Sequence, residues 1–147
     1  KVPVTLYVLG KIECYSFRSD FVKIYNLKLM PHDKLYEFLT EIHIVIKSNV
    51  VDEFPLFVGE CMSLGLIPVL SDKIGISEYI VNGVNGFVYD SEKIEEVKMI
   101  LENIYNGKYD IQTISQHAQN IVDELNWNKI AQKYLEVYQS VIGCKTK

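Results

Sequence analysis

Short apolar runs that alternate with amphipathic segments constrain the fold of this chain more than any other feature. Three apolar runs are interpreted as strands: Val4–Gly10, which is expected to be buried, Ile42–Ile46 and Ile67–Ser71. Ile42–Ile46 is nearly all apolar, which is typical of strands covered on both faces. Because only residues 11–20 join the first two strands, one flank of the sheet is expected to be less covered. A helical segment begins at Pro31, a residue well placed in a first helical turn. Because strands that alternate with helices normally form a parallel sheet, the pattern predicts an α/β fold with a parallel sheet flanked by helices.

The same pattern predicts the remaining elements. They are strands at 21–27 and 87–89 and helices from 55 or 56 to 64, at 76–81, at 111–125 and at 130–141. A further helix is expected between Ser91, as its N-cap, and Gly107. Since nothing indicates a linker or a repeat, residues 1–147 are expected to form one Rossmann-like domain with C-terminal helices.

Composition excludes several classes of protein. The chain has 147 residues and a net charge of −4, and no run of Lys or Arg suggests nucleic-acid binding. Its apolar runs fall far short of the roughly 20 residues that span a bilayer. Cys14, Cys61 and Cys144 lie far apart, without the spacing of metal ligands. We therefore expect reduced thiols in a cytoplasmic protein.

Residues 51–65 hold the most informative polar side chains. Glu60 stands beside apolar residues at the start of a predicted helix, and a carboxylate in such surroundings normally needs a partner. The segment follows a predicted strand, and ligands bind at the carboxyl ends of parallel strands. A helix start favours a phosphate, and a carboxylate can accept two ribose hydroxyls. One interpretation is therefore a nucleotide site. The other is that Glu60 is present only because the helix dipole favours an acidic residue near a helix start.

Four motifs follow one another along the chain. They are Phe54-Pro55-Leu56 with Glu60, Met62 and Gly65; Pro68–Asp72 with Gly75–Glu78; Ile80–Gly86; and Asn126–Tyr138. In this order they resemble the C-terminal, donor-binding half of retaining GT-B glycosyltransferases of the family 4 type (glycosyl transferases group 1). The resemblance runs from about Val4 to the C-terminus and is strongest between Asp52 and Val88.

The resemblance implies roles for individual residues. Glu60 aligns with the carboxylate that holds the donor ribose, and Asp52 aligns with the first acidic residue of the motif, which reaches the donor sugar. Other positions align through their backbones: Phe54, Leu56 and Phe57 with the stretch that meets the diphosphate and sugar, and Leu29 and Met30 with the loop that reads the base. No certain catalytic side chain, no metal and no cofactor are implied.

The resemblance also implies a function. It is that of a hexosyl-type glycosyltransferase in glycan biosynthesis, which takes a sugar from a nucleotide-diphosphate sugar and passes it to a glycan or lipid. The acceptor would be held by an N-terminal domain absent from this chain, so the fragment alone is expected to be inactive. Exposed apolar residues near the C-terminus would mark the surface for that domain. A position at the inner face of a membrane, with peripheral association through the missing half, stays open.

Several departures favour an alternative, a degenerate non-catalytic GT-B-like interaction module. Asp52 is one methylene shorter than the usual Glu, and Ile74 replaces the first Gly of a Gly-Gly pair. Only residues 11–20 join the first two strands, where the family usually has a helix, and the family's basic pair is absent.

A third alternative is a response-regulator-like domain. It would need an acidic cluster after the first strand, where the chain has only Glu13 and Asp20.

Overall fold

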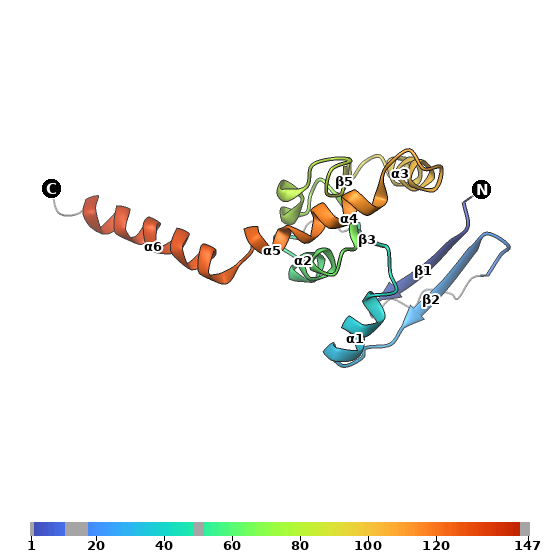
Figure 1. Cartoon of the computed structure of the whole chain (residues 1–147), viewed down its shortest axis with the longest axis horizontal. Helices are drawn as coiled ribbons and strands as arrows, with labels where there is room; N and C mark the ends of the chain where they lie inside the picture. Colours follow the sequence, from blue (N-terminus) through green and yellow to red (C-terminus); the bar gives the residue numbers. More distant parts are fainter. Residues whose placement is uncertain (1, 11–17, 49–51, 145–147) are drawn as a thin grey trace.

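Strands and helices alternate along the first two thirds of the chain, and helices follow one another in the last third (Figure 1). The computed structural model describes residues 2–10, 18–48 and 52–144. Its elements are β1 (Val4–Leu9), β2 (Val22–Leu27), α1 (His32–Leu39), β3 (Ile44–Lys47), α2 (Leu56–Ser63), β4 (Ile67–Ser71), the 3₁₀ helix η1 (Gly75–Tyr79), β5 (Phe87–Tyr89), α3 (Glu95–Tyr105), α4 (Ile111–Gln119), α5 (Ile121–Glu124) and α6 (Trp127–Cys144). The predicted α/β fold with parallel strands flanked by helices is confirmed.

The strands are divided between two parallel sheets, where the sequence predicted one. β1 pairs with β2, and β3, β4 and β5 form the second sheet in that order. The sequence also predicted a buried first strand, and this was wrong: Leu6, Tyr7 and Leu9 are each 37–38% exposed. Their exposure agrees with the expectation that the short first connection leaves one flank of the sheet less covered.

The core lies around β4, every residue of which is buried. Val58 and Met62 of α2 pack with Leu70 of β4 and with Ile74 in the loop that follows. On the β5 side, a second cluster joins the same sheet to α3 and α4. This central strand therefore has apolar cover on both faces.

Four predicted helices differ from the helices of the structure. Ser91 does not cap α3, because the helix begins only at Glu95 and its N-cap is Ile94. The Ser91 backbone N–H instead donates to Asp72 Oδ1 at 3.0 Å. The helix predicted at 111–125 is divided at Asn120 into α4 and α5. The helix predicted at 76–81 is the short 3₁₀ turn η1. The last helix starts before 130, at Trp127.

The last helix, α6, projects away from the rest of the chain (Figure 1). Its described side chains are exposed apart from Ile130, which is half-buried. They include several large apolar residues that are half or more exposed, namely Trp127, Tyr134, Leu135, Val137, Tyr138, Val141 and Ile142. The predicted exposed apolar residues near the C-terminus are thus present, and no neighbouring element buries them.

Candidate functional site

Two loops meet at the carboxyl end of the β3–β4 pair and extend it as a short parallel bridge between Asp52 and Ile74. The Gly75 N–H donates to the carbonyl oxygen of Asp52 at 2.9 Å, and the Asp52 N–H donates to that of Lys73 at 3.5 Å. The Asp52 carboxylate lies 3.0 Å from Lys47 Nζ, with both side chains less than a third exposed. Asp52 is therefore fixed through both its backbone and its side chain.

Ile74 and Gly75, which stand where the family has a Gly-Gly pair, have different structural roles. A Cβ added at Gly75 would collide with the carbonyl oxygen of Glu53, so the close approach of the two loops requires glycine there. Ile74, at the position where the family has its first glycine, is 1% exposed and belongs to the core. The departure at Ile74 thus adds apolar packing, while the residue that allows the loops to meet is kept.

The start of α2 lies next to this junction. Pro55 is its N-cap, and no side chain caps the helix there. Leu56 is 61% exposed and Phe54 is 38% exposed, with its ring edge-to-face against Tyr79 at 6.1 Å. Phe57 instead packs partly into the core beside Leu39 and Cys61. Uncapped N–H groups at a helix start favour an anion, and here exposed apolar side chains flank them.

Glu60, one turn further along α2, has partners from α1. Its Oε1 lies 4.0 Å from His32 Nε2, and its side chain is 38% exposed. The rings of His32 and Tyr36 are 4.5 Å apart. Burial raises the pKa of Tyr36, and the negative charge of Glu60 and a side-chain hydrogen bond to it raise that pKa further. The expectation that this carboxylate needs partners is met by these two residues of the chain itself.

The thiol of Cys61, the residue next to Glu60, is unreactive in the folded chain. Cys61 is fully buried, and burial together with the nearby charge of Glu60 raises its pKa to about 12. It therefore stays protonated at neutral pH and is no nucleophile. Its place is in the core, with Leu39 and Leu66.

The predicted base loop lies at the other sheet, between β2 and α1. Leu29 is 79% exposed, whereas Met30 is half-buried. Pro31 is the N-cap of α1, and His32 is the first residue of that helix. The loop therefore leads directly into the helix whose side chains meet Glu60.

Sequence reasoning missed three residues of this site: Lys47, His32 and Tyr36. Lys47 is the last residue of β3, where side chains reach the ligand-binding edge of a parallel sheet. His32 and Tyr36 are four residues apart and so share one face of α1. The strand end at Lys47 and the four-residue spacing of His32 and Tyr36 can both be read from the sequence. That Glu60 is the partner of His32 and Tyr36 follows only from the packing of α1 on α2.

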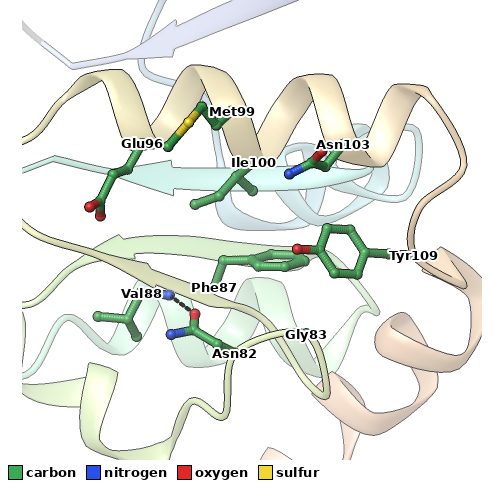
Figure 2. A pocket seen from close by; sticks show the side chains of 9 residues that line it. All are labelled: Asn82, Gly83, Phe87, Val88, Glu96, Met99, Ile100, Asn103 and Tyr109. Carbon is green, nitrogen blue, oxygen red and sulfur yellow. Dashed lines mark hydrogen bonds between the residues drawn. The ribbon is translucent and has the colours of Figure 1, made fainter.

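Two cavities lie elsewhere in the structure. One, of about 270 Å³, opens between α3, β5 and the turn at Asn82 and Gly83, with the rings of Phe87 and Tyr109 at its base (Figure 2). The other, of about 660 Å³, lies between the β1–β2 sheet and α3. Neither is lined by a predicted site residue.

The described residues contain no group of three or more His, Cys, Asp or Glu side chains that could hold a metal ion. Within that same part of the chain, no helix combines the length and apolar character needed to cross a membrane.

Solved structures with the same fold include a glycosyltransferase. HepE from Anabaena, solved in complex with UDP, superposes with a TM-score of 0.66 at 21% identity, over 82% of this chain and 33% of HepE. Sucrose-phosphate synthase from Thermosynechococcus elongatus gives 0.63 at 16% identity, over 83% and 31%. A glycosyltransferase from Rickettsia africae gives 0.59 at 18% identity, over 84% and 32%. The fold is that of GT-B glycosyltransferases, and the chain spans about a third of the length of these proteins.

The sequence itself identifies the family. The profile of glycosyl transferases group 1 matches residues 23–123, which is more than half of the chain. This chain therefore belongs to that family, as its motifs predicted. Among curated protein sequences, none matches it significantly.

Proposed function

We propose that this chain is the C-terminal, donor-binding half of a retaining glycosyltransferase of the family 4 type. The observation that carries the proposal is the spacing along α2. An uncapped helix start at Leu56 precedes the half-exposed Glu60 by about one helical turn, or roughly 6 Å. That spacing suits a diphosphate at the helix start and ribose hydroxyls on the carboxylate.

Asp52 and Lys47 complete the proposed phosphate and sugar end. Asp52 lies at the junction of the two loops, where its carboxylate would meet the donor sugar. Lys47, 3.0 Å from that carboxylate, gives this edge a cation of its own, although the chain lacks the family's basic pair. The exposed Phe54 and Leu56 and the partly buried Phe57 would place their backbone along the diphosphate and sugar. Leu29 and Met30 would meet the base.

The proposed reaction transfers a hexosyl group from a nucleotide-diphosphate sugar to a glycan or lipid acceptor. The acceptor would be held by an N-terminal domain of the same protein, so the isolated chain would bind donor without turning it over. Most of the rate would come from positioning and from stabilising the leaving diphosphate. A cytoplasmic place of action, or one at the inner face of a membrane, belongs to the same proposal. HepE was solved with UDP and with UDP-glucose, so uridine donors are the first to test.

Saturation-transfer NMR and titration with UDP, GDP, ADP and UDP-glucose test the proposal. We expect ribose and base protons of at least one nucleotide to show contact. Glu60→Ala should weaken binding about tenfold or more, because hydrogen bonds to a charged group are worth about 1.5–3 kcal/mol. Glu41→Ala, at an exposed position of the turn after α1, is the matched control and should bind as the parent does. Absence of contact from every nucleotide, or equal affinity of the Glu60→Ala variant and the parent, would refute it.

The alternative is a non-catalytic GT-B-like interaction module. Apolar side chains of α6, among them Tyr134 and Tyr138, are more than half exposed on a helix that projects from the body (Figure 1), and this surface suits a partner protein as well as an acceptor domain. The full-length open reading frame separates the two functions. An upstream acceptor domain that carries a basic pair supports the transferase, and an upstream region without one supports the module.

A further inference from the structure

The α1 face that carries His32 and Tyr36 meets the functional carboxylate of α2. The two side chains are one turn apart, their rings are 4.5 Å apart, and His32 Nε2 lies 4.0 Å from Glu60 Oε1. Tyr36 is half-buried and interacts with Glu60 through its hydroxyl, whereas the His32 side chain is 70% exposed. The cluster is thus anchored on its inner side and open to solvent on its outer side.

A carboxylate in this setting keeps capacity for a ligand. Its two oxygens offer about four acceptor positions, of which the Tyr36 hydroxyl occupies one. A pair of vicinal hydroxyls can therefore still bind. A glutamate side chain loses rotamer entropy when it is fixed, and partners already present in the free protein reduce that cost at binding.

The same helix also begins at the base loop. Leu29 and Met30 lead through Pro31 directly to His32, the first residue of α1. Any shift of α1 would therefore move the end of the base loop and the partners of Glu60 together.

We propose that His32 and Tyr36 are positioning residues for donor recognition, which hold the Glu60 carboxylate in the orientation that accepts the ribose hydroxyls. The Tyr36 hydroxyl directs the carboxylate, and the His32 ring packs against Tyr36 and limits its rotation. This inference rests on the proposed function, because that function assigns the ribose to Glu60. The plain structural role, a contact that only joins α1 to α2, makes a different prediction for ligands that lack a ribose hydroxyl.

The test compares ribose with deoxyribose on the full chain. Dissociation constants are measured for UDP and GDP and for their 2′-deoxy analogues, with the parent, Tyr36→Phe, His32→Ala and Glu60→Ala. The parent should prefer the ribonucleotide, and Glu60→Ala should abolish that preference. Tyr36→Phe should weaken ribonucleotide binding about three- to tenfold while deoxynucleotide binding changes little. His32→Ala should act in the same direction more weakly. Tyr105→Phe, at an exposed position of α3, is the control and should leave all constants unchanged.

The possible results distinguish failure of the proposed function from failure of the positioning role alone. If the parent binds no nucleotide, or does not prefer ribose, the proposed function or its assignment of Glu60 fails and this inference falls with it. If Glu60→Ala abolishes the preference but Tyr36→Phe and His32→Ala retain it, only the positioning role is overturned. Equal weakening of ribo- and deoxynucleotides by Tyr36→Phe also overturns it, because that is the effect of a merely structural contact. Should Tyr36→Phe fold poorly in thermal denaturation, His32→Ala decides alone.

Discussion

Replacement of Ile74 tests whether this departure from the family's glycine pair serves the core. Ile74 is 1% exposed and packs in one cluster with Val58, Met62 and Leu70. Truncation of a buried isoleucine to alanine costs about 2–5 kcal/mol, because apolar contacts are lost and a cavity remains. Ile74→Gly, which restores the family's residue, should cost roughly 0.5–1 kcal/mol more through backbone entropy. At about 2–4 °C per kcal/mol, we expect Ile74→Ala to lower the Tm by about 4–20 °C.

The measurement is urea denaturation followed by circular dichroism, with thermal melts as a second readout. Ile142→Ala is the matched control, since Ile142 is 66% exposed on α6 and its truncation should change stability by about 0.5 kcal/mol at most. The reasoning is refuted if Ile74→Ala costs less than about 1 kcal/mol, or no more than the control. In that case the isoleucine would not serve the core, and its presence would count toward loss of donor binding.

Two predictions concern titrating groups. Because burial and Glu60 raise the pKa of Cys61 to about 12, a Cys14→Ser, Cys144→Ser variant should not react with a thiol reagent at pH 8 until it is unfolded; rapid labelling of the native protein would contradict this. The Ser91 N–H that donates to Asp72 lowers the pKa of Asp72 in the folded chain, so its stabilising effect is present above the unfolded pKa and is lost as pH falls through the folded value. Asp72→Asn should therefore destabilise the chain more at pH 7 than at pH 2.5 in urea denaturation, and an equal cost at both would contradict the assignment.

The sequence predicted the type and order of the elements because apolar spacing and turn residues are local signals. The nearly unbroken apolar run at β4 and the motif around Glu60 led to the correct strand, helix and family. Burial was harder to predict, since the apolar composition of β1 predicted a buried strand although Leu6, Tyr7 and Leu9 are more than a third exposed. Ser91 fits an N-cap locally, yet α3 begins only at Glu95, with Ile94 as its N-cap.

The contacts of the candidate site depended on tertiary packing in the same way. Lys47 and Asp52 meet because the bridge between Asp52 and Ile74 holds Asp52 at the end of the β3–β4 pair. Tyr36 and Glu60 meet because α1 packs beside α2. Neither pair has a spacing that a sequence pattern can select.

Because the strands are divided into two sheets, a donor bound as proposed would contact residues that follow strands of both. The base loop with Met30 follows β2 of the first sheet, whereas Asp52 and Glu60 follow β3 of the second, and among the described residues the strand hydrogen bonds stay within each sheet. The bridge at Asp52 and Ile74 joins the loops after β3 and β4. A nucleotide that contacts both Met30 and Glu60 would connect the two sheets across a boundary where the described strands share no backbone hydrogen bond, and donor binding would then stabilise the arrangement of the two sheets.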